Sequence, residues 1–183
     1  EGAEVSLNKA ISLSLNSSLL NQVHGLLLIA KGDFAKAIEK MEQALILDPL
    51  SLPLMCNLAD AYSFAGRFSE ALEQYDKVIE LDPTFRRAFE GKGTTYLASG
   101  DFELSIQNLE IYQKLIGNQL KGNSSLGHAY AAAGYIDKAM ECLDRIQQRE
   151  LLEPNVILDM DYAMVYSGLK EYDKAFYYLN KTY

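Results

Sequence analysis

Apolar residues recur along the chain at the three- and four-residue spacing of amphipathic helices. Between residues 52 and 83, two such stripes flank the turn sequence Ala-Gly-Arg-Phe-Ser at 65–69, and Pro83 ends the second stripe. The pattern therefore predicts two helices joined by a tight turn at Gly66, where glycine permits the positive φ of a helix end. The stripes are Leu58, Ala59, Tyr62 and Ala65, then Ala71, Leu72, Tyr75, Val78 and Ile79.

The same pattern recurs every 34 residues. Glycines stand at Gly32, Gly66, Gly100 and Gly134, and each is followed two places later by an apolar residue: Phe34, Phe68, Phe102 and Ile136. Small residues stand seven places before each glycine, at Gly25, Ala59, Gly93 and Gly127, and five places after, at Ala37, Ala71, Ser105 and Ala139. Short side chains let two antiparallel helices approach closely. We expect Ser69, Asp137 and Asp173 to cap the second helices.

The repeat predicts five units at 18–51, 52–85, 86–119, 120–153 and 156–183, all in one solenoid domain. The fifth unit fits with a slip of two residues, its turn glycine being displaced to Gly168. Residues 1–17 match the second half of a repeat, so we expect a lone helix near 3–14 and a chain that starts in mid-repeat. Gly117 and Gly122 flank the 117–124 junction, which is either a hinge or a longer turn.

The residues Leu-Ala-x-x-Tyr-x-x-x-Gly-x-Phe-x-x-Ala at 58–71, followed by Tyr75 and Pro83, resemble the tetratricopeptide repeat family. The resemblance covers nearly the whole chain. It implies an all-α fold, a right-handed superhelical solenoid of antiparallel helix pairs with about 11 helices. The third and fourth units lack the closing proline, and three polar residues replace the family's large apolar residue early in the first helix: Asn21, Asn123 and Asp159.

Charge and cysteine usage narrow the classes of partner. There are 25 acidic and 17 basic residues, a net charge of −8, which argues against a nucleic-acid or anionic-membrane partner. The most apolar run, at 25–30, is far shorter than the ~20 residues that cross a bilayer. Cys56 and Cys142 form no CxxC motif and suit a reducing compartment, so we expect a cytoplasmic protein.

The residues do not predict an enzyme. His24 and His128 are far apart in sequence, and no nucleophile, metal or phosphate-loop motif is present, so we expect no cofactor and no metal. We interpret His24 as a packed residue and both cysteines as inert apolar residues. Asp159 and Asp161 do not share a helical face, and we expect solvated or capping charges there.

The resemblance implies that first helices line a concave groove that binds a peptide or a partner protein. The candidate contacts are Asn57, Asp60, Phe64, Arg87, Glu90, Thr94, Leu97, Lys121, Ser124 and His128. Some family members grip a C-terminal carboxylate, but here only Asn57 and Arg87 match that site. Gln22, Leu26 and Gly91 occupy its other positions, so we expect no tight binding of acidic chaperone tails.

Two functions remain open. The first is a non-catalytic interaction scaffold, and residues 162–179 resemble the last repeat of tetratricopeptide tails on bacterial regulators, including cyclases. The second is a self-association or spacer module that controls a neighbouring output domain. Apolar residues near both ends could support a homodimer, namely Leu7, Ile11, Leu13 and Leu15, and the Phe-Tyr-Tyr-Leu sequence at 176–179.

Overall fold

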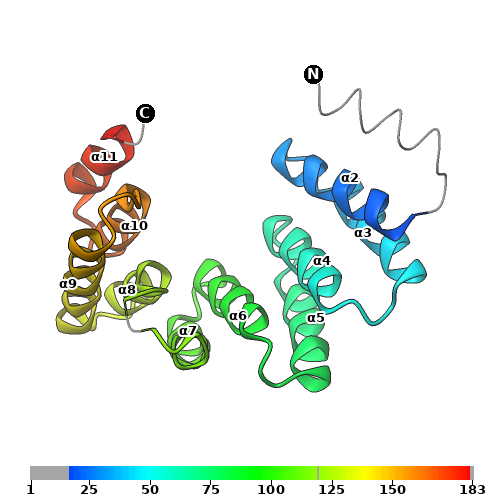
Figure 1. Ribbon diagram of the computed structural model, residues 1–183, viewed down its shortest axis with the longest axis horizontal. Coiled ribbons are helices and arrows are strands. Elements are labelled where there is room, and N and C mark those ends of the chain that lie inside the picture. Colours follow the sequence, from blue (N-terminus) through cyan, green and yellow to red (C-terminus); the bar gives the residue numbers. More distant parts are fainter. Residues whose placement is uncertain (1–16, 119, 182–183) are drawn as a thin grey trace. The chain divides into compact units, whose positions relative to one another are not determined.

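The computed structural model describes residues 17–118 and 120–181, and all regular secondary structure in these ranges is α-helical (Figure 1). Ten helices are described, in agreement with the predicted all-α fold of about 11. The predicted helix near 3–14 lies outside the described residues. The helices are α2 (Ser18–Ala30), α3 (Phe34–Leu47), α4 (Leu52–Phe64), α5 (Phe68–Leu81), α6 (Arg86–Ser99), α7 (Phe102–Ile116), α8 (Asn123–Ala132), α9 (Ile136–Leu152), α10 (Asp159–Gly168) and α11 (Tyr172–Lys181).

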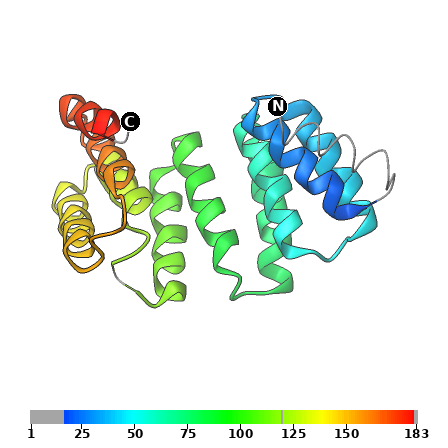
Figure 2. The same ribbon diagram turned by 45° about the horizontal axis from the view of Figure 1, so that its top comes forward.

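Helices that follow one another in sequence pack as pairs, which is the arrangement of a helical-repeat solenoid. The pairs α2–α3, α4–α5, α8–α9 and α10–α11 are in extensive contact, and Figure 2 shows the chain reversing direction between partners. First helices of successive pairs also touch, α2 with α4 and α8 with α10. The predicted fold class is therefore confirmed.

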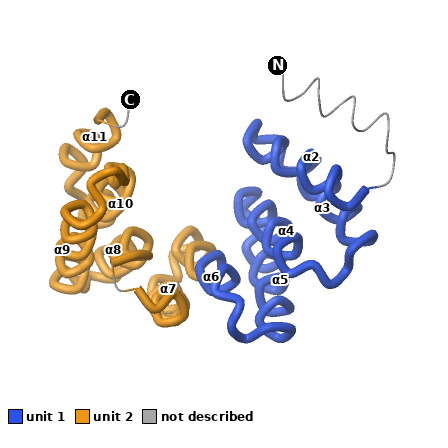
Figure 3. The backbone as a smooth tube through the Cα atoms, in the orientation of Figure 1, with its two compact units in different colours: residues 1–91 blue, residues 92–183 orange. Residues whose placement is uncertain are grey.

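The chain divides into two compact units, residues 1–91 and 92–183, and the division falls inside α6 (Figure 3). Each unit has its own apolar core. In the first unit Met41, Leu54 and Tyr75 are almost fully buried. In the second unit the almost fully buried residues include Leu109, Leu126 and Val165. The predicted repeat boundaries remain a prediction.

The small residues of the repeat lie where helices touch. A Cβ atom added at Gly25 would lie 2.7 Å from Met41 Cε, and one at Gly127 would lie 2.8 Å from Val165 Cγ2. Such distances are shorter than real Cβ contacts. Glycine at these positions therefore permits a close approach that a side chain would prevent.

The turns between paired helices use a left-handed residue, and the fifth turn differs from the prediction. Gly134 has φ of +87°, and the corresponding residue of the last pair is Lys170, with φ of +61°. Gly168 is the last residue of α10, and a Cβ there would meet the backbone of His128 at 2.9 Å. The displaced-glycine prediction was wrong, because Gly168 serves packing while a lysine occupies the turn.

The predicted N-caps were also wrong. The second helices begin earlier than expected, at Phe68, Ile136 and Tyr172, so Ser69, Asp137 and Asp173 lie inside the first turn. The acidic side chains there still favour the positive end of the helix dipole. Asp33 does act as a cap, accepting a hydrogen bond from the Lys36 backbone N–H at 3.4 Å.

The 117–124 junction leaves helical geometry between α7 and α8. Gly117 and Gly122 both have positive φ, of +64° and +71°. The Asn118 side chain accepts a hydrogen bond from the Leu120 backbone N–H at 2.9 Å, which closes a local turn. The described part of the junction is therefore an extended turn, and its action as a hinge stays a prediction.

No helix in the described ranges is both long and apolar enough to cross a membrane.

Candidate functional site

A polar cluster in the first unit joins three of the predicted contacts. The Arg87 guanidinium donates from Nη2 to Asn57 Oδ1 at 2.5 Å and to Asp60 Oδ2 at 2.7 Å. Its Nη1 donates to the Pro53 carbonyl oxygen at 3.2 Å. Asn57 and Asp60 are one turn apart on α4, and Arg87 is the second residue of α6. One side chain thus ties the start of α6 to three positions along α4.

The buried side of this cluster is closed by Tyr75 from α5. Its hydroxyl donates to Asp60 Oδ1, and the residue is only 1% exposed. Burial, followed by the nearby Asp60 charge, raises the pKa of Tyr75 well above its usual value, so the phenol remains a donor. Asp60 is therefore held from two sides, by a buried phenol and by a guanidinium.

The outer side of the cluster is open to solvent. The side chains of Arg87 and Asp60 are 40% and 30% exposed. Phe64, one turn further along α4, is 60% exposed, and its ring stacks on Phe34 with centroids 6.1 Å apart. The result is a charged pair next to an exposed aromatic residue on the same helix. This combination can bind a chain that offers both a polar and an apolar side chain.

The cysteines have no reactive environment. Both are buried, and burial raises the pKa of Cys56 to about 12 and that of Cys142 to about 11. Both thiols remain protonated at neutral pH, and thiols are poor nucleophiles. Both cysteines are therefore buried in the apolar cores, and their inertness stays a prediction.

The remaining predicted contacts are distributed differently. Glu90 lies on the α6 segment of the first unit, and Thr94 and Leu97 lie on the α6 segment of the second. All three are partly buried. Lys121 precedes the first residue of α8, so its predicted location on a first helix was wrong. Gly122, with its left-handed backbone, delays the start of that helix.

Ser124 and His128 do lie on α8. The His128 Nδ1 atom is 3.0 Å from the Met164 carbonyl oxygen of α10. Burial is the main influence on its ionisation and lowers the pKa of His128. The imidazole thus takes part in packing between two first helices.

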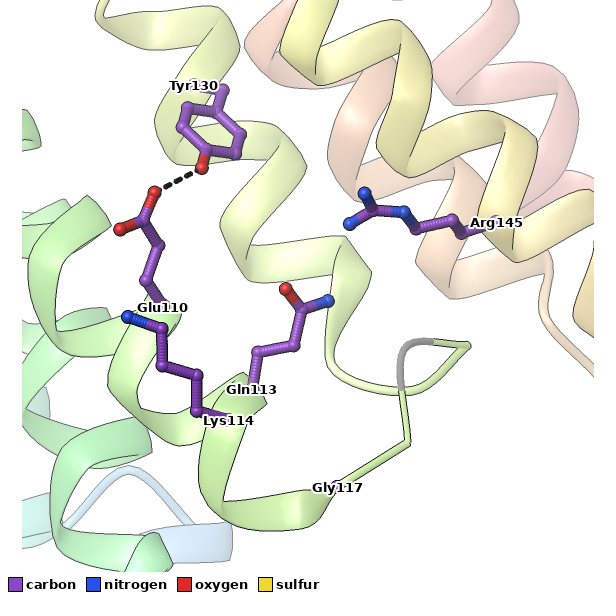
Figure 4. A pocket seen from close by; sticks show the side chains of 6 residues that line it. All are labelled: Glu110, Gln113, Lys114, Gly117, Tyr130 and Arg145. Carbon is purple, nitrogen blue, oxygen red and sulfur yellow. Dashed lines mark hydrogen bonds between the residues drawn. The ribbon is translucent and has the colours of Figure 1, made fainter.

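A polar pocket of about 460 Å³ was not predicted from the sequence (Figure 4). It lies in the second unit and is lined by Glu110, Gln113, Lys114, Gly117, Tyr130 and Arg145. The Tyr130 hydroxyl donates to Glu110 Oε1 at 2.6 Å, and Tyr62 makes the same bond to Glu42 at 2.7 Å in the first unit. Each bond spans 20 residues and links a first helix to the preceding second helix. A glutamate that precedes a tyrosine by 20 residues recurs in the two units, and this spacing is the sequence signal that could have predicted the Glu110–Tyr130 contact in the pocket.

The environment of Asp159 differs from the solvated position expected from the sequence. It is buried rather than solvated, and its Oδ1 atom is 3.1 Å from Lys181 Nζ. The end of α11 thus lies beside the start of α10. Within the residues that the structure describes, no group of three or more His, Cys, Asp or Glu side chains is arranged to hold a metal ion.

Comparisons with known proteins agree with this geometry. The tetratricopeptide repeat model matches residues 28–93, and the PPR repeat model matches residues 124–151. A comparison with curated protein sequences gives no match. Among solved structures, the thermophilic protein TTC0263 of Thermus thermophilus is 20% identical, with a TM-score of 0.73 over 90% of this chain and 89% of that one.

Two further structures have the same fold. A crystal structure of MamA is 26% identical, with a TM-score of 0.58 over 86% of this chain and 91% of that one. YrrB, a tetratricopeptide protein with an unusual peptide-binding site, is 18% identical, with a TM-score of 0.58 over 96% and 89%. The fold is that of a helical-repeat protein, and residues 28–93 match the tetratricopeptide repeat model.

Proposed function

We propose that this chain is a non-catalytic interaction scaffold that binds an extended peptide segment of a partner protein. The primary contact surface consists of Asp60, Phe64, Arg87 and Glu90 in the first unit, and Asn57, which is only 5% exposed, contributes by holding Arg87. The observation that carries the proposal is the Arg87 guanidinium, which is held by Asn57 and Asp60 yet is 40% exposed. A side chain fixed in this way loses little rotamer freedom when a ligand binds.

The chemistry of this surface suggests its ligand. Leu19 and Leu26 of α2 and Phe64 of α4 are exposed apolar residues on first helices. An extended segment with an apolar anchor would contact them, and an acidic or amide group next to that anchor would reach Arg87. We propose no tight site for an acidic chaperone tail, because only Asn57 and Arg87 match the residues of such a site.

The second unit contributes separate contacts in this proposal. Thr94, Leu97, Lys121, Ser124 and His128 are retained as candidate contacts there. The peptide-binding site of the similar protein YrrB supports peptide binding as a use of this fold.

RNA is the competing ligand, because PPR repeats read RNA bases and residues 124–151 match that repeat. Charge argues against it. The chain carries 25 acidic against 17 basic residues, whereas RNA binding depends on neutralising phosphates with lysine and arginine. A fluorescent single-stranded RNA at low salt tests the point, and saturable binding would refute the proposed ligand class.

We also propose a reducing compartment, the cytoplasm, and a parent protein of the bacterial regulator type. The proposed compartment rests on two free, buried cysteines, and the proposed parent protein rests on the residue pattern at 162–179. Sequencing the gene around this coding sequence tests the proposed parent protein. A cyclase or winged-helix region in the same reading frame would support it, and a different output region would refute it.

Peptide selection tests the proposed surface. A displayed library of 12-residue peptides is selected on the wild-type chain, and the enriched peptides are measured by fluorescence anisotropy. Phe64→Ser and Leu26→Ser alter side chains that are 60% and 44% exposed, so we expect both variants to fold. We expect each to weaken binding about tenfold, because each removes a buried anchor from the complex.

Ile46→Ser is the matched control, since Ile46 is also exposed in the first unit but lies on a second helix. It should leave affinity unchanged. The proposed surface would be refuted if the selected peptides bound the wild type and the three variants with equal affinity. It would also be refuted if the selection enriched no peptide.

A further inference from the structure

The polar pocket of about 460 Å³ in the second unit is not explained by the proposed peptide surface, because none of its lining residues belongs to the candidate contacts. Its volume is in the range of small-molecule sites. Glu110, Gln113 and Lys114 line it from α7, and Arg145 of α9 reaches into it from the opposite side (Figure 4). Charged side chains from two second helices therefore face one hollow.

The repeat itself does not require these polar residues. Two repeats earlier in the register, Leu45 and Ile46 of α3 stand at the positions of Gln113 and Lys114. The tyrosine–glutamate hydrogen bond next to these positions still forms in both units, at 2.7 and 2.6 Å. Apolar side chains at these positions are thus compatible with the fold, and the polar residues of the pocket call for another explanation.

The two cations of the pocket have little compensation from the protein. Lys114 is exposed and forms no ion pair within the described ranges. Arg145 Nη2 is 3.6 Å from Oε2 of Glu141, whose side chain is 64% exposed. At the equivalent positions of the first unit, Lys77 and Glu73 form an ion pair of 2.8 Å. The Arg145 guanidinium is therefore loosely held and is available to a ligand.

The pocket also contains one carboxylate. Glu110 Oε1 accepts the hydrogen bond from the Tyr130 hydroxyl at 2.6 Å, which leaves Oε2 able to accept from a ligand. Burial and this hydrogen bond raise the pKa of Tyr130, and the nearby positive charge of Arg145 opposes the rise. The guanidinium thus lies within electrostatic range of the Glu110–Tyr130 bond. Together the lining residues offer a ligand two positive groups and one negative group.

We propose that this pocket binds a small amino dicarboxylate, a molecule with two carboxylates and one ammonium group, such as free glutamate. Arg145 binds one carboxylate through its planar guanidinium, Lys114 binds the other, and the ammonium donates to Glu110. Because the two cations come from opposite sides of the pocket, they suit a ligand whose carboxylates are separated (Figure 4). Inorganic phosphate fits less well, since it concentrates its negative charge and offers Glu110 no ammonium.

Isothermal titration calorimetry of the 183-residue chain with L-glutamate tests this site. We expect saturable binding with a Kd below about 1 mM. Glutarate keeps both carboxylates but lacks the ammonium, so it should bind about tenfold more weakly. Arg145→Gln and Lys114→Gln should each weaken glutamate binding about tenfold, because each removes a charge-assisted hydrogen bond. Circular dichroism identifies any variant that fails to fold, and the other variant then decides.

Glu110→Gln separates recognition of the ammonium from general attraction of anions. The amide oxygen of the new side chain can still accept from Tyr130, but it carries no charge, so the preference for glutamate over glutarate should disappear. Lys77→Gln is the control, since Lys77 is the equivalent of Arg145 in the first unit and lies outside the pocket. It should bind glutamate like the wild type.

Three results would overturn the proposal. The first is that glutamate shows no saturable binding up to about 10 mM. The second is that glutarate or inorganic phosphate binds the wild type as tightly as glutamate does. The third is that Arg145→Gln and Lys114→Gln both leave the affinity for glutamate unchanged.

Discussion

Lys170 is the one described non-glycine residue with a left-handed backbone, and replacing it tests the turn geometry directly. At the corresponding position of the preceding pair, Gly134 has φ of +87°, and Lys170 has φ of +61°. The hydrogen bonds around the two residues match. The N–H groups of Tyr135 and Glu171 return to the Tyr130 and Tyr166 carbonyls at 2.8 and 3.0 Å. Both turns therefore require a left-handed backbone at this position, but only the turn at 134 has a glycine there.

The structure sets the expected size of the effect. A left-handed backbone costs a residue with a Cβ about 1–2 kcal/mol, and glycine avoids this cost. The gain is reduced by about 0.4–1 kcal/mol, because glycine makes the unfolded chain more flexible. The Lys170 side chain is exposed, so little packing is lost. We therefore expect Lys170→Gly to raise the free energy of unfolding by about 0.5–1 kcal/mol.

Urea unfolding followed by circular dichroism measures this change. Lys170→Ala is the matched control, because it removes the side chain but keeps the strain, and it should not stabilise. Gly134→Ala tests the reverse case. A Cβ there would meet nothing within 4 Å, so its expected loss of about 1 kcal/mol would come from the backbone alone. If Lys170→Gly destabilised the protein, or if Gly134→Ala matched the wild type, the argument from backbone strain would be refuted.

Three further predictions follow from the packing. Tyr75→Phe should lower the free energy of unfolding by about 1.5 kcal/mol in urea, because Asp60 loses a buried donor, whereas Tyr177→Phe at an exposed position should change nothing. Gly127→Leu should cost about 1–3 kcal/mol by overpacking the α8–α10 contact, and a thermal melt at the wild-type temperature would contradict this. Burial lowers the folded-state pKa of His128, so the unfolded chain binds a proton first as pH falls. Stability should therefore decrease below about pH 6.5, and His128→Asn should show a smaller loss between about pH 7.5 and pH 5.

Much of the fold was predictable because the residues that define the repeat act through their own backbone angles and their near neighbours in sequence. Gly66 and Gly134 mark turns through their own backbone angles, and Tyr62 and Val78 mark buried faces through helical spacing. Such features depend on neighbours within a few residues. They can be read from one chain without knowing what packs against it.

The errors arose where a residue's role depends on a distant part of the chain. Gly168 looked like a displaced turn residue, but its contact is with His128, 40 residues away in sequence. Asp159 looked solvated, but Lys181 lies beside it. Lys121 was assigned to a helix that Gly122 delays. In each case, the local pattern allowed two roles and a tertiary contact or a backbone angle selected one.

The candidate site shows the same division. The repeat register predicted that Asn57, Asp60 and Arg87 would lie on first helices, but it did not predict that Arg87 would bond to both of the others. By itself the sequence determined the helices, their pairing and the small-residue contacts, because periodicity and backbone preference act over short separations. Only the tertiary structure decided which charges are paired and which apolar faces remain open. Those properties depend on side chains that the repeat brings together from helices about 30 residues apart, here Arg87 with Asn57.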